Sequence, residues 1–375
     1  MRVNKNLIVL VVVAVLLSLV AAQCGQPQVI EKEVVVTKEI EKEVIVTKEV
    51  EVEKEVIVTK EVEVEKEVLV EPDYVSLRTN WLFSGIHAWL FYGREQGYFK
   101  DENIVLDIRE GNGSGNVVRT VINKNDDFAL VSVQPPLISI SQGAPIKFIY
   151  TWIGDFTWGY LCHPDSGVKE AKDLEGKIIV SSPGNAGIAA HPAFIEKAGL
   201  DPDKMIDLTL VDGGAMVPTV LTGKADCELG GVSDHQPLWE AEGVTPNVVW
   251  MKDYGIAGPA TAIITHDDMI KDNPDLVARL VRAMQESQMA CAEDVEGCTQ
   301  ALLNAHPAMD LDTQRMSLEM SIVDWLGANQ DCVGQFVKEN WDFGYQLLKN
   351  VPDSTVEGDL PIEDYYTEDF VPACP

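Results

Sequence analysis

The sequence is short of basic residues. It contains 29 Lys and Arg against 60 Asp and Glu, which gives a formal net charge of −31 at pH 7. Residues 1–71 hold nine of the basic and fourteen of the acidic residues, so the rest of the chain has 20 basic and 46 acidic residues and a net charge of −26. A field of that sign repels nucleic acid and anionic surfaces. We therefore expect no nucleic-acid partner, and the charge disfavours an exposed site for small anions.

The sequence also lacks the spacings that hold metals or activate nucleophiles. No Cys-x-x-Cys occurs, and no His flanks a Cys at the spacing of zinc ligands. No nucleophile elbow, Ser-His-Asp order, metal-binding helix or dinucleotide fingerprint appears. These absences predict no metal, no cofactor and no catalytic residue, and on this basis we expect that the protein is not an enzyme.

Residues 31–71 contain no Gly, Pro, Asn or aromatic residue, so nothing in them turns the chain or packs as a core. All fourteen Glu of this stretch stand at odd positions and all seven Lys at even positions. Strict alternation is the strand pattern, but a single strand without turn residues has no partner. Residues 24–72 are therefore interpreted as a solvated Glu/Val/Lys repeat stalk, extended or helical, that carries no chemistry.

An apolar run precedes this stalk. Residues 7–22 are uncharged and follow Arg2 and Lys5, which is the layout of a signal peptide. The run is shorter than the roughly 20 residues that span a bilayer. Residues 1–23 are predicted to be a bacterial lipoprotein signal with Cys24 as the acylated residue. Ordinary cleavage and an uncleaved anchor are the alternatives. Each version places the protein outside the cytoplasm, and lipidation places it on the outer face of the cell membrane.

Six cysteines follow Cys24, and export would allow them to form disulfides. They are Cys162, Cys227, Cys291, Cys298, Cys332 and Cys374. Six cysteines allow fifteen sets of three disulfides, among which the sequence does not choose. The favoured pair is Cys291 with Cys298, because the short loop between them closes without distant rearrangement.

After Tyr74 the sequence alternates between short apolar strands and helices. Strands are predicted at 104–109, 128–133 and 146–152, and the same rhythm restarts at 177–181. This alternation predicts an α/β fold of two lobes, each a mostly parallel sheet flanked by helices. The predicted division is 73–165 for the first part of lobe 1, 166–257 for lobe 2, and 258–375 for a return to lobe 1 with C-terminal helices.

Several segments carry a family resemblance. They are Asn80 with Trp81, His87 with Ala88, and the stretches 93–99, 166–177 and 221–226. In this order they resemble the solute-binding proteins of ABC importers for thiamine pyrimidine precursors, riboflavin, alkanesulfonates or nitrate. The resemblance runs from about Tyr74 to the helices near residue 300. It implies a two-lobed periplasmic-binding-protein fold of type II that closes around a ligand and delivers it to permease subunits.

Ligands of open α/β sheets bind beyond the carboxyl ends of the strands, so the loops there hold the candidate residues. The glycine-rich loop 111–115 opens a helix, and either it offers N–H groups to a polar ligand or it is a plain tight turn. Aromatic residues near 81 and 152–160 are expected in loops, as stacking surfaces for a flat ring. Aspartates in the loops are candidate acceptors for amino or hydroxyl groups. The predicted ligand-binding residues are Asn80, Trp81, Phe83, His87, Gly113, Ser114, Gly115, Ser132, Gln134, Trp152, Asp155, Trp158, Ser182, Asn185, Asp212 and Asp234.

None of these loops contains Arg or Lys, so the preferred ligand is a neutral or weakly basic heteroaromatic molecule, riboflavin or a thiamine-type aminopyrimidine. An alkanesulfonate or nitrate is the alternative. One intracellular branch of the same superfamily makes the thiamine pyrimidine with an active-site His, a Lys-bound pyridoxal phosphate and a Cys-rich metal motif. The scattered cysteines here argue against that branch. A surface adhesion or sensor protein is the third class.

Overall fold

The structure is a computed structural model, and it describes residues 71–210, 212–325, 333–350 and 354–373. The predicted signal peptide, Cys24 and almost all of the predicted stalk lie outside these residues. The described chain belongs to one compact unit that begins at Glu67. Among its helices, none combines the length and the apolar character that crossing a bilayer requires.

The first lobe is built on a sheet in the order β2-β1-β3-β10-β4. Its strands are β1 (Asp73–Arg78), β2 (Ile104–Arg109), β3 (Phe128–Ser132), β4 (Ile146–Ile153) and β10 (Thr261–His266). Strand β10 runs against the others, since it pairs antiparallel with both β3 and β4. The helices of this lobe are η1 (Gly85–His87), α2 (Ala88–Gln96), α3 (Tyr98–Asp101), α4 (Ser114–Ile122), α5 (Gln134–Ser141), α9 (Asp267–Asp272), α10 (Pro274–Glu293), α11 (Val295–Ala305) and η7 (Ile362–Asp364).

The second lobe repeats this plan in the order β7-β6-β8-β5-β9, with β5 as the antiparallel strand. Its strands are β5 (Trp158–Cys162), β6 (Ile178–Ser181), β7 (Ile206–Thr209), β8 (Cys227–Gly231) and β9 (Asn247–Trp250). Its helices are η2 (Pro164–Ser166), η3 (Ala171–Leu174), α6 (Gly187–Lys197), η4 (Pro202–Lys204), η5 (Gly213–Ala215), α7 (Met216–Leu221), α8 (Val232–Ala241) and η6 (Met251–Tyr254). Two mostly parallel sheets flanked by helices confirm the predicted fold class.

Strand periodicity places a separate core on each face of each sheet. In β3, Phe128 and Leu130 pack into one cluster, while Ala129 and Val131 pack into another on the opposite face. This alternation follows from the period of two in a strand, and because helices cover both faces, every residue of β3 is apolar except Ser132 at its end.

The chain crosses from the first sheet to the second between β4 and β5 and returns between β9 and β10. Because β5 belongs to the second sheet, the crossing precedes the boundary predicted at residue 165. The strands β5, β9 and β10 were not predicted. Trp152 ends the strand predicted at 146–152 and lies in β4, so it is a buried strand residue and not part of a loop surface. Tyr160 was expected in a loop, and that expectation is wrong, because it lies fully buried in β5.

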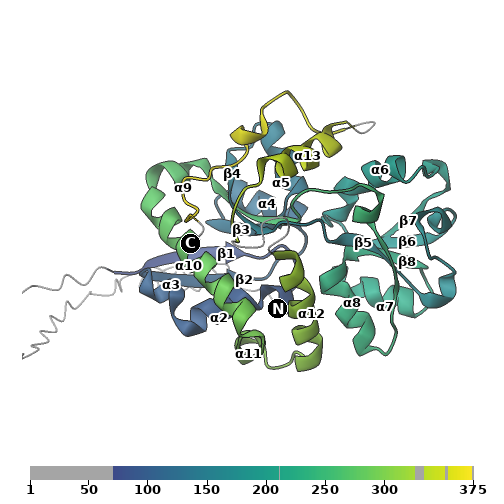
Figure 1. Cartoon of the computed structure of the whole chain (residues 1–375), viewed down its shortest axis with the longest axis horizontal. Coiled ribbons are helices and arrows are strands. Elements are labelled where there is room, and N and C mark those ends of the chain that lie inside the picture. The colour runs from purple at the N-terminus through teal and green to yellow at the C-terminus, as the bar shows by residue number, and fades with distance from the viewer. Residues whose placement is uncertain (1–70, 211, 326–332, 351–353, 374–375) are drawn as a thin grey trace, which may run out of the picture. The chain divides into compact units, whose positions relative to one another are not determined.

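Two C-terminal helices, α12 (Leu311–Trp325) and α13 (Lys338–Lys349), span both lobes. Helix α12 packs on α8, and its Met320 contacts one core cluster of lobe 2 (Figure 1). Helix α13 packs on α5 and α6, and its Leu347 contacts the other core cluster of lobe 2. Lobe 2 is therefore held on both faces of its sheet by helices whose remaining contacts lie in lobe 1.

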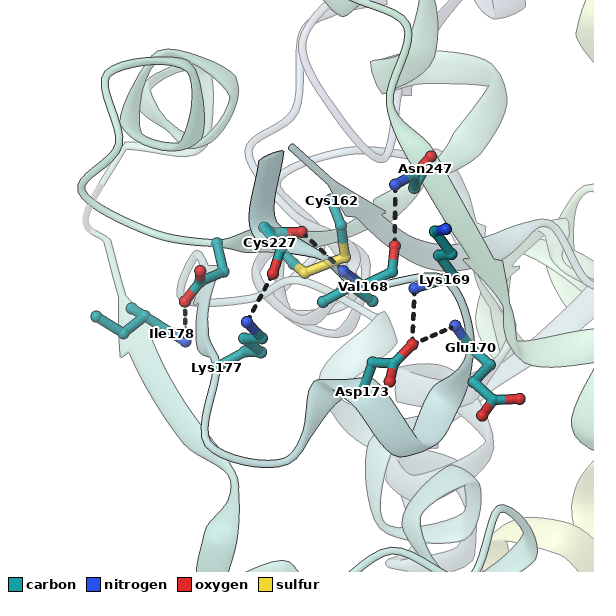
Figure 2. The surroundings of a disulfide bond; sticks show 11 residues. Cys162, Val168, Lys169, Glu170, Asp173, Lys177, Ile178, Cys227 and Asn247 are labelled. Atoms are coloured by element: carbon teal, nitrogen blue, oxygen red, sulfur yellow. Dashed lines mark hydrogen bonds between the residues drawn. A yellow bond between two sulfur atoms is a disulfide. The ribbon is translucent and has the colours of Figure 1, made fainter. Parts of the chain in front are cut away.

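Two disulfides are present among the described residues. Cys291–Cys298 joins the end of α10 to the start of α11, which confirms the predicted pair. Cys162–Cys227 was not predicted, and it links directly opposed positions of β5 and β8 with Cα atoms 4.0 Å apart. Figure 2 shows it beside the β5–β6 connection, where the Asp173 carboxylate accepts hydrogen bonds from backbone N–H groups. The Cys162–Cys227 disulfide fastens the strand that enters lobe 2 to the middle of its sheet.

Replacing both Cys162 and Cys227 by Ala should destabilise the protein by about 4 kcal/mol, because that disulfide closes a loop with a sequence separation of 65 residues. The same change at Cys291 and Cys298 should cost about 2 kcal/mol, since the separation there is 7 residues. Urea unfolding of the two double variants gives the comparison. Equal losses of unfolding free energy, or a larger loss from removing Cys291–Cys298, would contradict the prediction that the longer loop makes the Cys162–Cys227 disulfide the more stabilising one.

Candidate functional site

The loops after the strands of the two lobes meet. The Gly115 N–H donates to the Gly184 carbonyl oxygen across 3.2 Å, and the Ser84 hydroxyl donates to Asp234 across 2.6 Å. The Trp81 ring lies against Gly213, where a Cβ would collide with it. We call this boundary, formed by residues 80–84 and 111–115 of lobe 1 with 181–185, 213 and 234 of lobe 2, the interlobe seam.

The glycine-rich loop at the seam is mostly occupied by the chain's own hydrogen bonds. The N–H groups of Gly111, Gly113 and Gly115 donate to the carbonyl oxygens of Trp81, Asn80 and Gly184. Gly113 has φ +111°, and a Cβ there would lie 2.7 Å from the Gly184 oxygen. Ser114 is buried and accepts a hydrogen bond from the Ser132 N–H across 2.9 Å. These contacts favour the tight-turn interpretation of the loop over an anion-binding one.

Several of the buried side-chain oxygens that lack a hydrogen-bond partner among the described residues lie at or next to strand ends of the two lobes. In lobe 1 they belong to Ser132, Thr261 and Gln134, and in lobe 2 to Ser181 and Ser182. Ser132 and Thr261 are opposite one another in the β3–β10 register, so their side chains share one face of the sheet. Leaving a buried polar group unpaired costs roughly 1–3 kcal/mol. Such a set at the ends of strands from both lobes is typical of a site that binds a polar ligand.

The predicted residue His87 is a buried partner of Asn80. Its Nδ1 accepts from the Ser84 backbone N–H at 3.3 Å, and its Nε2 lies 2.9 Å from Asn80 Oδ1, an arrangement that needs the proton on Nε2. Burial lowers the pKa of His87 to about 3, so the ring is neutral. With Asn80 Oδ1 used in this way, the Nδ2 group is the end of the Asn80 amide that can donate to a ligand. His87 therefore positions Asn80.

The predicted aromatic residues separate into two groups. Trp81 and Trp158 are partly exposed, and Trp158 packs against Gly187 at the start of α6. Phe83 is also partly exposed, but it packs on Phe91 and His306 within lobe 1. Trp152 is buried in β4 with its ring 5.9 Å from those of His87 and Trp89. Its position is that of a core residue, whereas Trp81, after β1, and Trp158, at the start of β5, are partly buried and pack against the core clusters of lobe 2.

The remaining predicted polar residues differ in what they contact. Asn185 uses both ends of its amide inside the chain, donating to the Leu229 oxygen and accepting from the Gly187 N–H. Asp212 is exposed and accepts from the Gly214 N–H at the start of η5. Both are turn residues. Asp234 is bound to Ser84 across the seam, and burial raises its pKa against the effect of that hydrogen bond.

A buried ion pair was missed by the sequence analysis. Glu228 in β8 accepts from the Trp239 indole N–H at 2.7 Å, and its other oxygen lies 3.1 Å from His235 Nδ1. Burial opposes protonation of His235, but the Glu228 carboxylate outweighs it and raises the pKa of the ring. The His235 ring lies 6.2 Å from that of Trp81. The sequence did contain a signal for this pair: Glu228 is a charged residue inside an otherwise uncharged strand, and His235 follows seven positions later.

A second carboxylate near the boundary was also missed. Asp324 at the end of α12 is buried, and its side chain lies 3.9 Å from Lys252 of lobe 2. Burial raises the pKa of Asp324 to about 6, Lys252 opposes this rise, and Asp155 of the β4–β5 crossing adds to it. The predicted residue Asp155 thus acts on Asp324 through charge. In the described parts of the chain, no group of three or more His, Cys, Asp or Glu is placed to hold a metal ion.

Comparisons with known proteins agree on the family and the fold. A protein-family model described as NMT1/THI5 like matches residues 85–296. The 4-amino-5-hydroxymethyl-2-methylpyrimidine phosphate synthase of Schizosaccharomyces pombe is 22% identical over 234 residues, which are 59% of this chain and 66% of that protein. The protein of that name from Uromyces fabae is 22% identical over 315 residues, or 80% of this chain and 88% of the relative.

A solved structure extends this similarity to the two-lobed fold. The alkanesulfonate-binding protein SsuA from Xanthomonas axonopodis pv. citri, bound to MOPS, matches with a TM-score of 0.60 and 13% identity. The match covers 76% of this chain and 97% of that one. The resemblance found in the sequence is confirmed for the family and the fold.

The prediction that the protein is not an enzyme is contradicted, because several relatives are named as synthases. The prediction relied on absent motifs and scattered cysteines. An active site assembled from the ends of separate strands leaves no contiguous motif, so that absence does not exclude chemistry.

Replacing Gly113 by Ala should destabilise the protein by about 2 kcal/mol, because the new Cβ meets the Gly184 oxygen and the backbone keeps a positive φ. Gly143 is the matched control, since it has φ +88° and a Cβ added there would meet no atom within 4 Å beyond its chain neighbours. Gly143→Ala should cost about 1 kcal/mol from the backbone alone. Unfolding in urea measures both, and a Gly143→Ala loss as large as that of Gly113→Ala would contradict the seam contact.

Replacing Asp324 by Asn should stabilise the protein at pH 7.5 by about 1 kcal/mol, allowing for partial screening of the carboxylate. The pKa of Asp324 is raised in the folded state, from its ordinary value of 3.8 to about 6. The folded state therefore holds the proton more tightly, and stability falls as pH rises from about 4 through about 6. Urea unfolding between pH 4 and pH 8 should show that fall in the wild type and a smaller one in Asp324→Asn. Asp253→Asn, at an exposed position, is the control. If Asp324→Asn shows the same pH profile as the wild type, the pH dependence does not come from Asp324.

Proposed function

The chain belongs to the NMT1/THI5-like family, and on that basis we propose that it captures a small heteroaromatic solute between its lobes and delivers it to an ABC permease. The solute class is riboflavin or a thiamine-type aminopyrimidine. Capture proceeds by closure of the lobes at the interlobe seam, with the crossings between β4 and β5 and between β9 and β10 as the hinge.

The observation that carries this proposal is the set of buried oxygens at the strand ends of both lobes that lack partners among the described residues. Ser132 and Thr261 supply them from lobe 1, and Ser181 and Ser182 from lobe 2. A ligand between the lobes that hydrogen-bonds to both sides would remove the cost of burying these groups. It would bind the closed arrangement better than the open one, which is the requirement for ligand-driven closure.

The charges near the seam support a ligand that is neutral or weakly basic. Asp234, Asp324 and Asp155 carry acceptor oxygens there, while the cation Lys252 is already paired with Asp324. The Nδ2 end of Asn80 can donate to a ring nitrogen or carbonyl, and Trp81 and Trp158 offer faces for stacking. A sulfonate or nitrate would need donors that the occupied N–H groups of the glycine loop do not supply.

An extracytoplasmic location supports the same function. Two disulfides join described residues, and such bonds persist in oxidising compartments. With the signal at 1–23, acylation at Cys24 and the repeat stalk, the proposal places the binding lobes on a tether at the outer face of the membrane. The length of the stalk would let them reach a permease.

The second candidate function is the pyrimidine phosphate synthesis named for the relatives. The observation that favours it is the Glu228–His235 pair beside Trp81, because a carboxylate that orients a buried His is a common arrangement for proton transfer. In this chain a Glu228 oxygen lies 3.1 Å from His235 Nδ1, and Nε2 is the other ring nitrogen.

A thermal-shift screen of the purified protein tests the first proposal. Riboflavin or an aminopyrimidine at 100 times its dissociation constant should stabilise the fold by about 2.7 kcal/mol. Stabilisation by sulfonates or nitrate alone would contradict the heteroaromatic class. Absorbance of a bound cofactor near the visible edge, together with formation of a pyrimidine phosphate, would favour the second candidate.

A further inference from the structure

Helix α12 has an unusual polar stripe for a buried surface. Gln314, Ser317, Ser321 and Asp324 are all buried, with exposed fractions of 7%, 1%, 0% and 8%. Their spacing of three, four and three residues places them on one arc of about 80° of the helix. Buried helix faces are normally apolar, so a continuous polar arc needs a physical reason.

The polar atoms of three of these residues have no partner among the described residues. They are Gln314 Oε1, Ser317 Oγ and Ser321 Oγ. Other helical hydroxyls in this protein do find partners, since Thr299 and Ser139 donate to the carbonyl oxygen four residues earlier. The two serines of α12 do not make that bond, and each unpaired group is costly.

The packing of α12 shows what the stripe faces. On one side of it, Leu318 and Trp325 pack into the core of lobe 1. On the other side, Met320 packs against the core of lobe 2. The polar arc lies between these two directions around the helix, so it faces the boundary between the lobes.

Two contacts confirm that direction at the ends of the stripe. Asp324 lies 3.9 Å from Lys252 of lobe 2. Gly85 lies directly on the Gln314 backbone oxygen, and Gly85 follows Ser84, which is bound to Asp234 of α8. Helices α12 and α8 also pack on one another (Figure 1). The stripe therefore borders the same seam from a third element, independent of the strand ends.

We propose that this face of α12 is a third wall of the ligand site and that Gln314, Ser317 and Ser321 bind hydrogen-bond-donating amino or hydroxyl groups of the ligand. This inference rests on the proposed capture of a solute between the lobes. The chemistry follows from the atoms present, because Gln314 Oε1 accepts, the serine hydroxyls accept or donate, and Asp324 adds an acceptor at the end of the stripe. A heteroaromatic ring that carries an amino group, or a chain of hydroxyls, matches this wall.

A ligand wall and a purely structural surface predict opposite effects of removing the hydroxyls. In the protein without ligand, Ser317→Ala and Ser321→Ala remove buried groups that lack partners among the described residues, so the apparent Tm should rise by about 2–4 °C. In the complex the same changes remove bonds to the ligand, so the dissociation constant should increase about tenfold or more.

The experiment compares wild type, Ser317→Ala/Ser321→Ala and the control Ser287→Ala by calorimetric titration and thermal unfolding. The probes are riboflavin and 4-amino-5-hydroxymethyl-2-methylpyrimidine. Ser287 is buried in α10 and donates to the Trp89 oxygen, so its replacement should lower Tm and leave the dissociation constant unchanged.

A raised Tm with weakened binding in the double variant supports the proposal. Unchanged binding of a probe that wild type binds overturns it and leaves the capture function standing. If the double variant binds the probe more weakly and also has a lower Tm, the serines have a structural role, and the proposal is overturned. If wild type binds neither probe, the proposed function fails and this inference fails with it.

Discussion

Polar side chains buried between two lobes are the constraint on which the rest of this structure depends. Several oxygens at the strand ends and on α12 lack partners among the described residues, and burying each of them costs free energy. The cores on both faces of each sheet are, by contrast, apolar. A sequence that keeps such groups buried must recover the cost elsewhere or from another molecule. Interlobe hydrogen bonds such as Ser84–Asp234 stabilise the contact between the lobes, but they involve other atoms and leave these oxygens unpaired within the described part of the chain.

The second lobe is braced internally by a disulfide and externally by two helices. The Cys162–Cys227 disulfide ties β5 to β8, so the strand that enters lobe 2 cannot slide relative to its sheet. Helices α12 and α13 hold lobe 2 from the two faces of that sheet. Under the proposed closure, a change in the distance between the lobes would alter the crossings and the α12–α8 and α13–α6 contacts. The polar stripe of α12 lies along the α12–α8 contact, so under the proposed function a ligand bound there would favour closure.

Much of the fold was predictable because its signals are local. Strand β2 falls on the predicted residues 104–109, and the short Cys291–Cys298 loop identified its own disulfide. The missed features depend on distant partners. Cys162 and Cys227 meet only because β5 and β8 are neighbours, and β5 itself resembles a loop in sequence because Trp158 and Gly159 open it. The role of His87 was not predictable either, since it depends on Ser84 and Asn80 occupying its two ring nitrogens. The buried face of helix α12 is polar, so the apolar periodicity that normally marks a buried helix face is missing there. The burial of that face could therefore not be predicted from the sequence.

The charges near the seam bear on both functions proposed for this chain. Carboxylates of Asp234 and Asp324 and the Glu228–His235 pair lie around one boundary, and each is either protonated more readily than usual or already paired. Such groups are poor partners for an anion and good partners for amino and hydroxyl groups, whether the bound molecule is only carried or also changed. Under either proposal, the specificity of the site and any proton transfer in it would depend on the same buried acids. His235 is the residue with which the two proposals can be told apart, because its Nδ1 lies 3.1 Å from a Glu228 oxygen and the pKa of its ring is raised.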